Sequence, residues 1–174
     1  MQCSVSKTKI ALFNLYVPVN HVEKKECWLS LSNFLDTNSL SNIIVAGDLN
    51  ITLDPSEKKG GVMGRDPLLN FFESIMHTWD LIDYKPTRRR FTWSNNRAGS
   101  NSILARLDRF LVQSTLLDKN FIISSKILPK TSSDQHAISL LLKNEEDYGP
   151  IPFRFSPLWI ERDRFLDIVI KAWS

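Results

Sequence analysis

The stretch Ile43-Ile44-Val45-Ala46-Gly47-Asp48-Leu49-Asn50 determines how the rest of the sequence is interpreted. Its first four residues form a short apolar run rich in β-branched side chains, and Gly47 closes the run, which predicts a buried strand. Asp48 follows directly, and because side chains alternate along a strand we expect Asn50 to point the same way. A carboxylate and an amide on one side suit a hard cation such as Mg²⁺, or a phosphate with its attacking water. The alternative is that Asp48 and Asn50 only cap a turn.

The length and composition of the chain exclude several classes of protein. Its 174 residues, 43% apolar and 24% charged, are typical of one globular domain and not of a disordered chain. No apolar stretch suits a membrane span or a secretory signal, so we expect a nuclear or cytoplasmic protein with no membrane partner. Two cysteines and three histidines give neither a disulfide framework nor a zinc site, and nothing indicates a small-molecule cofactor.

The apolar pattern predicts a mixed α/β fold with seven strands. Residues 9–16 are almost continuously apolar and are expected to form a strand buried on both faces. The expected strands that follow it lie at residues 43–46, 81–84, 91–94, 104–112, 121–128 and 137–142. Together with two helices they predict an α/β sandwich with mixed sheets.

Two helices are expected between these strands. Residues 22–35 carry apolar side chains at helical spacing, so that one face is buried. The residues on that face are Trp28, Leu31, Phe34 and Leu35. The second helix is expected to be capped by Asp66, with Pro67 at its first position.

Clustered positive charge indicates an anionic partner. The whole chain has 22 basic and 19 acidic residues, a net charge of +3. Between Tyr84 and Phe110, seven basic residues stand against one acid, Asp108, so this segment alone carries +6. Such a cluster attracts polyanions, whereas the alternative is an ordinary solvated turn. The basic residues are Lys85, Arg88, Arg89, Arg90, Arg97, Arg106 and Arg109.

Three further motifs carry polar groups near the ends of expected strands. Phe91-Thr92-Trp93-Ser94-Asn95 places an aromatic strand end beside the basic run, although Trp93 could equally be a rim residue that closes the sandwich. Arg106-Leu107-Asp108-Arg109-Phe110 embeds an acid in an apolar strand, where the alternative is a structural ion pair with Arg106 or Arg109. Ser133-Asp134-Gln135-His136-Ala137-Ile138 precedes the final strand.

In this order and spacing the motifs resemble the endonuclease/exonuclease/phosphatase family, and within it the apurinic-type endonuclease domain of plant non-LTR (LINE-type) retrotransposons. Leu15-Tyr16-Val17-Pro18 is similar to the family's strand ending in Tyr-x-Pro, and Gly47-Asp48-Leu49-Asn50 to its Gly-Asp-[Phe/Leu]-Asn. The resemblance extends over about residues 10–142. It implies a four-layer α/β/β/α fold and hydrolysis of DNA phosphodiesters with Mg²⁺ or Mn²⁺.

The resemblance also implies a role for each site residue. Asp48 would position or activate the attacking water, and Asn50 would orient that water or hold the phosphate. Tyr16 would contact the phosphate or stabilise the water. Asp108 would orient a catalytic histidine, and Asp134 would join Asp48 in the metal network.

Contacts with the DNA backbone follow from the same resemblance. Arg88, Arg89 and Arg90 would meet phosphates, and Trp93 would stack on a base or deoxyribose, an interaction of about 1–3 kcal/mol per base. Asn95, in the same motif as Trp93, is a further candidate contact.

Two departures from the family predict that this chain is inactive. Gln135 takes the catalytic histidine position, and an amide cannot carry a proton at neutral pH. His136 could replace it only by a one-residue slip in register, and the alternation of side chains would turn His136 away from the cleft. The family's opening strands and its metal-ligand Glu are expected to be missing, because the first Glu of the chain, Glu23, follows the strand that ends at Tyr16.

We therefore expect residues 1–143 to be a partial endonuclease/exonuclease/phosphatase domain. Residues 144–157 would be a proline-containing linker, and residues 158–174 a helix resembling the connector toward the reverse transcriptase of a parent polyprotein. The expected function is that of an inactive remnant of a retrotransposon DNA endonuclease. Alternatives are a non-catalytic nucleic-acid-binding module or an unselected retroelement fragment. A phosphatase of the same fold is disfavoured by the basic run.

Overall fold

A computed structural model of the chain describes residues 8–62, 64–119, 121–130, 133–144 and 170–171. At its centre is a four-stranded sheet in the order β1 (Ala11–Tyr16), β2 (Ile43–Asp48), β7 (Asp108–Gln113) and β4 (Leu81–Asp83). β1 and β2 are parallel, and β7 is antiparallel to both of its neighbours.

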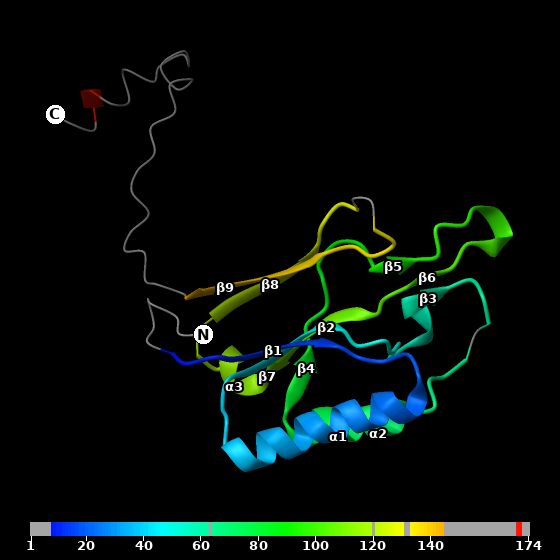
Figure 1. The fold of residues 1–174 in the computed structure, drawn as a ribbon. Coiled ribbons are helices and arrows are strands. Elements are labelled where there is room, and N and C mark those ends of the chain that lie inside the picture. The colour runs from blue at the N-terminus through cyan, green and yellow to red at the C-terminus, as the bar shows by residue number, and fades with distance from the viewer. Residues whose placement is uncertain (1–7, 63, 120, 131–132, 145–169, 172–174) are drawn as a thin grey trace.

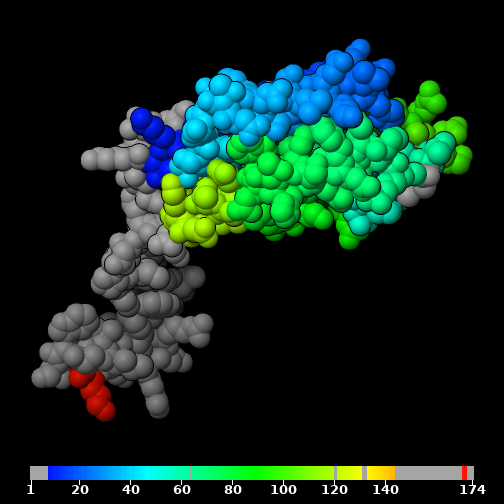
Figure 2. Space-filling model, turned by 90° about the horizontal axis from the view of Figure 1, so that it is seen from below, coloured from blue at the N-terminus to red at the C-terminus, as the bar shows by residue number. Residues whose placement is uncertain are grey.

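Helices cover one face of this sheet and a hairpin covers the other (Figure 1). α1 (His21–Asn38) and α2 (Leu69–Thr78) pack side by side, and a view from their side shows them together on the surface (Figure 2). β8 (Phe121–Ile127) and β9 (Ile138–Asn144) form the antiparallel hairpin on the opposite face. The described residues therefore build helix, sheet and sheet layers of an α/β sandwich.

The smaller elements form a third sheet and three short helical turns. β3 (Lys58–Lys59), β6 (Leu104–Ala105) and β5 (Trp93–Ser94) pair in that order. The single strand predicted at residues 104–112 is in fact two, since β6 pairs with β5 whereas β7 pairs with β2. The helical turns are η1 (Pro55–Glu57), η2 (Gly99–Asn101) and α3 (Ser114–Leu117).

Alternation along β2 divides the core into two halves. Ile43 and Val45 join the apolar cluster under the helices, and Ile44 joins the cluster under the hairpin. The prediction that this strand is buried is confirmed. Between the helices, Trp28 and Phe72 meet edge to face with ring centroids 4.8 Å apart, a geometry that aromatic pairs prefer.

The predicted burial of residues 9–16 on both faces is wrong. In β1 the side chains alternate between half-buried and exposed, and Leu12 and Tyr16 are 50% and 75% exposed. β1 is the edge strand of the described sheet, so among the described residues it pairs with a strand on one side alone. The exposed residues lie on the hairpin face, where Leu12 is not part of the apolar cluster.

Both predicted helices form, with shifted ends. α1 extends beyond residues 22–35, because the Asn20 side chain accepts hydrogen bonds from the first turn and Ser39 ends the helix in the left-handed conformation. Phe34, predicted to be buried, is 49% exposed. Asp66 does not cap α2, which begins at Leu69. Its carboxylate instead accepts from the backbone N–H of Leu68, the residue just before the helix.

The predicted linker and C-terminal helix lie almost entirely outside the described residues. Of residues 144–174, only Asn144 in β9 and the helical residues 170–171 are described. None of the helices in the described part of the chain is both long and apolar enough to cross a membrane.

Candidate functional site

Three predicted site residues line up across the central sheet. In the strand register Tyr16 of β1 lies opposite Asp48 of β2, which in turn lies opposite Asp108 of β7. Directly opposed antiparallel residues have Cβ atoms about 4.5–5.5 Å apart on one face. The two carboxylates are therefore close neighbours on the hairpin face, with the exposed Tyr16 side chain beside them.

A glycine at position 47 is required for this row to form. Gly47 has φ +119°, in a region that L side chains rarely adopt, and a Cβ there would lie 2.1 Å from the Leu15 carbonyl oxygen. Its lack of a side chain lets β2 pass close to β1 immediately before Asp48.

Each oxygen of the buried Asp48 carboxylate accepts a hydrogen bond. Oδ1 accepts from the backbone N–H of Asn50 at 3.0 Å, so the turn-capping alternative is correct for this atom. Oδ2 accepts from Nε2 of Gln135 at 2.6 Å. The carboxylate thus closes the turn after β2 and also contacts the residue at the expected histidine position.

Asp108 is held without an ionic partner among the described residues. The alternative considered for Asp108, a structural ion pair with Arg106 or Arg109, does not form, because both arginines bind other carboxylates. Burial, reinforced by the nearby charge of Asp48, raises the pKa of Asp108 to about 6. Its Oδ2 is buried without a hydrogen-bond partner in the described structure, which is a costly state for a charged oxygen.

The other residues of the Ser133–Ile138 motif are engaged at the mouth of the hairpin. The Asp134 carboxylate accepts from Nε1 of Trp93 at 3.0 Å, and Trp93 also forms a backbone bridge with Gln135. Nδ1 of His136 lies 3.0 Å from the Leu128 carbonyl oxygen at the end of β8. The His136 ring is therefore engaged with the residue that follows β8, whereas Gln135 is the member of the motif that contacts Asp48.

Asn50 leaves the strand pattern, and a buried lysine holds its backbone. Since β2 ends at Asp48, the strand alternation expected to carry Asn50 to the same side does not extend to it. Asn50 has φ +47°, and its Nδ2 donates to the Val17 carbonyl at 2.6 Å. Nζ of Lys24, 2% exposed, donates to the Asn50 carbonyl at 2.6 Å and to Asp66 at 3.0 Å. Its spacing from Trp28, four residues later, places Lys24 on the buried face of α1.

A buried network of four charges lies behind Asp108, and sequence reasoning missed it. Arg106 binds Asp83 through two nitrogens, each at 2.6 Å, and Glu57 at 2.8 Å. Arg109 binds the same two acids and donates to the Ile51 carbonyl. Although burial acts in the opposite direction, hydrogen bonds and charge from Arg109 lower the pKa of Glu57 to about 2.

The basic run is only partly a surface feature. Arg106 and Arg109 are buried and neutralised, whereas Arg88, Arg89 and Arg90 are exposed. In the described structure no hydrogen bond or ion pair holds Arg88 or Arg90, and Arg89 reaches the Leu128 carbonyl at 3.5 Å.

The side chain of Asn95 has a structural role in the loop between β5 and β6. Its Oδ1 accepts from the backbone N–H groups of Arg97 and Ile103, and its Nδ2 donates to the Asn101 carbonyl at 2.9 Å. The prediction that Asn95 contacts nucleic acid is therefore not supported by the geometry, since its amide already closes the loop between β5 and β6.

The donors present do not form a metal site by themselves. No group of three or more acidic, histidine or cysteine side chains that could hold a metal occurs in the described ranges. Asp48 and Asp108 are opposed, but one Asp48 oxygen is bound to the Gln135 amide and Asp134 is bound to Trp93. Mg²⁺ prefers near-octahedral oxygen ligands, so these two carboxylates would have to be supplemented by water and substrate oxygens.

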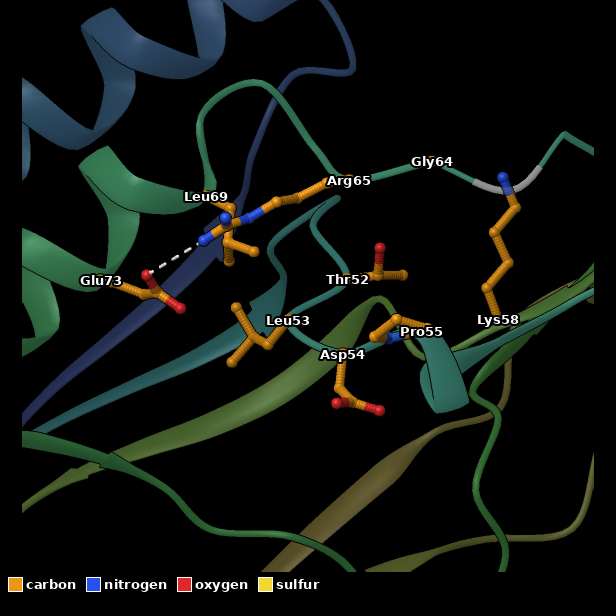
Figure 3. A pocket seen from close by; sticks show the side chains of 9 residues that line it. All are labelled: Thr52, Leu53, Asp54, Pro55, Lys58, Gly64, Arg65, Leu69 and Glu73. Carbon is orange, nitrogen blue, oxygen red and sulfur yellow. Dashed lines mark ion pairs between the residues drawn. The ribbon is translucent and has the colours of Figure 1, made fainter.

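A cavity of about 500 Å³ lies apart from the predicted site residues, none of which lines it. It is formed between the segment after β2 and the start of α2, and Figure 3 shows Arg65 and Glu73 pointing toward one another on one side of it. Their charged atoms are 3.7 Å apart, and both side chains are more than half exposed. With apolar and oppositely charged residues in its lining, this cavity indicates no particular ligand.

Comparison with known proteins relates the chain to transposon proteins. No family model matches it. Over 168 residues, 93% of the chain, it is 28% identical to the transposon TX1 uncharacterized 149 kDa protein of Xenopus laevis. The chain spans only 12% of the length of that relative.

Two solved structures are similar to the chain. The endonuclease domain of TRAS1, a telomere-specific non-LTR retrotransposon, matches with a TM-score of 0.61 and 15% identity, over 82% of this chain and 61% of that one. An endonuclease/exonuclease/phosphatase family protein from Bacteroides thetaiotaomicron matches with a TM-score of 0.52 and 14% identity, over 81% and 52% of the two chains. The predicted fold class is confirmed, while the plant branch remains a prediction.

Proposed function

We propose that the chain is part of a retroelement endonuclease domain that binds the DNA backbone beside Asp48 and Asp108 without hydrolysing it. The likeness to a transposon protein and to the fold of a retrotransposon endonuclease supports this class of function. The proposed parent is a polyprotein that also carries reverse transcriptase.

The observation that carries the proposal is the hydrogen bond of 2.6 Å between Nε2 of Gln135 and Oδ2 of Asp48. In the motif, Gln135 stands where the family has its catalytic histidine. An amide can donate a hydrogen bond to a phosphate oxygen, but it can neither take up nor release a proton near pH 7. General acid–base catalysis typically contributes about 10²–10⁴-fold to a rate, so its loss favours binding over turnover.

The residues around Asp48 have binding roles in this proposal. The Tyr16 side chain is 75% exposed beside Asp48, so its hydroxyl can donate to a phosphate oxygen. Arg88, Arg89 and Arg90 supply positive charge for neighbouring phosphates. We assign no step to a metal ion, because the described donors do not form a metal site by themselves.

A nicking assay tests the absence of turnover. With Mg²⁺ or with Mn²⁺, the full chain is expected to nick supercoiled plasmid no faster than the background rate without protein. Gln135→His is expected to be equally inactive, because an imidazole adds one group to a site with only two opposed carboxylates. Nicking by the natural chain that a chelator abolishes and that disappears in Asp48→Ala would refute the proposal.

One observation favours a second candidate, an active phosphodiesterase. The Asp108 carboxyl, with a pKa of about 6, has the protonation behaviour expected of a general acid or base. In that case hydrolysis would change with pH around 6 and would be lost in Asp108→Asn. A flat background rate between pH 5 and about 8 would exclude this candidate.

A further inference from the structure

A second cavity, of about 280 Å³, lies beneath the loop that follows β4. Lys85, Arg89 and Arg90 of that loop line it, together with Ser56 of η1 and the buried Arg106. Arg88, in the middle of the basic run, is not among the residues that line the cavity. The structure thus divides the run into cavity-lining and outward positions.

The acids near this cavity are already occupied. Glu57, which also lines it, accepts from Arg106, from Arg109 and from the backbone N–H of Leu53. Asp83 is bound to the same two arginines, so two positive charges offset two negative ones. Because the oxygens of Glu57 and Asp83 already accept hydrogen bonds from the two arginines, these carboxylates are poorly placed to bind a further cation.

What remains around the cavity is a set of positive charges and one buried donor without a partner in the described structure. Lys85, Arg89 and Arg90 carry +3, and the acid whose charge interacts with Lys85, the exposed Asp54, is outside the lining. Within the described structure the Nε–H of Arg106 has no hydrogen-bond partner, although the side chain is 4% exposed. Buried donors normally have partners, so the missing acceptor indicates a ligand.

The geometry points to this cavity as a binding site for a phosphate group, held by Arg89 and Arg90 with Lys85 at its side. Arginine presents several N–H donors in a planar fork, which matches the oxygens of a phosphate. The group could belong to the DNA backbone, an assignment that rests on the proposed function, or to free phosphate. In either case the site is distinct from the row of Tyr16, Asp48 and Asp108.

Calorimetric titration of the full chain with pyrophosphate and with inorganic phosphate at low salt tests the site. Arg89→Ala and Arg90→Ala should each weaken binding by about tenfold, the typical value of one charge-assisted hydrogen bond. For these two small anions Arg88→Ala is the matched control, since Arg88 carries the same charge at the adjacent position but does not line the cavity. It should change the binding of pyrophosphate and phosphate by less than about twofold, while its contact with the DNA backbone is a separate part of the proposed function. All three residues are exposed, so their melting temperatures should equal that of the natural chain.

A labelled DNA duplex identifies the source of the phosphate. If the site takes a backbone phosphate, pyrophosphate should compete with the duplex, and Arg90→Ala should reduce the log–log salt slope by about 0.9, the value for one contact. Phosphate binding without competition assigns the site to free phosphate. Equal effects of Arg88→Ala and Arg90→Ala on the binding of pyrophosphate, or no effect of either, would overturn the site. Neither result depends on whether the chain nicks DNA.

Discussion

Replacing Asp108 by asparagine should stabilise the protein at neutral pH. The substitution keeps the shape of the side chain and removes a charge that is buried opposite Asp48. Asp108 has a raised pKa because of its burial, and one of its oxygens has no hydrogen-bond partner in the described structure. If Asp108 were instead half of a structural ion pair, the same substitution would destabilise the fold.

The magnitude follows from the pKa. The carboxyl titrates at about 6 in the folded chain and ordinarily at 3.8. Because one pKa unit corresponds to about 1.4 kcal/mol, ionising the folded protein costs at most about 3 kcal/mol at pH 7. Water near the partly exposed side chain lowers this figure, and we expect a gain of about 1–3 kcal/mol in Asp108→Asn.

The sign can be checked against pH. The folded chain binds this proton more tightly than the unfolded chain, so its favourable contribution is complete below the ordinary pKa of 3.8 and is lost as the pH rises through about 6. Urea unfolding at several pH values should therefore show nearly equal stability of the two proteins near pH 4 and a widening difference toward pH 7.

Asp83→Asn is the matched control for this experiment. It neutralises an acid that does bind Arg106 and Arg109, and breaking a buried pair typically costs about 3–5 kcal/mol. Its destabilisation should be present at pH 7, where Asp108→Asn is stabilising. A loss of stability in Asp108→Asn at pH 7, or a difference that does not change with pH, would refute the reasoning.

Three further predictions concern the groups that support the site. Glu57, whose pKa is about 2 in the folded chain, adds stability that is present above its ordinary value of 4.5 and is lost toward pH 2; Glu57→Gln should cost about 3–5 kcal/mol in urea unfolding at pH 7. Lys24→Met should cost about 1–3 kcal/mol of stability, because it leaves the Asn50 carbonyl and the Asp66 carboxylate without the lysine. Lys25 is exposed, so Lys25→Met should be nearly neutral by the same assay. Gly47→Ala should lower the melting temperature sharply or prevent folding, since the added Cβ would lie 2.1 Å from backbone; a normal melting curve would show that β1 and β2 can separate without cost.

The sequence by itself determined the elements whose signals are local. The apolar runs of β2, β8 and β9 and the periodicity of α1 and α2 depend only on side-chain alternation along one segment. The order of the motifs also indicated the fold class, through their resemblance to the endonuclease/exonuclease/phosphatase family. The predicted ends of the helices were less accurate, because the Asp66 carboxylate can accept a backbone hydrogen bond equally well in a turn or at the start of a helix.

The tertiary structure alone decided which charged groups meet. Arg106 and Arg109 stand beside Asp108 in sequence, yet they bind Glu57 and Asp83, which are brought to them by other segments. Alternation places Arg109 on the helix face of the sheet and Asp108 on the hairpin face. The local pattern does not show which residues from other segments lie on either face. The exposure of β1 likewise depends on neighbours across the sheet, because burial is a property of the assembled layers and not of the segment.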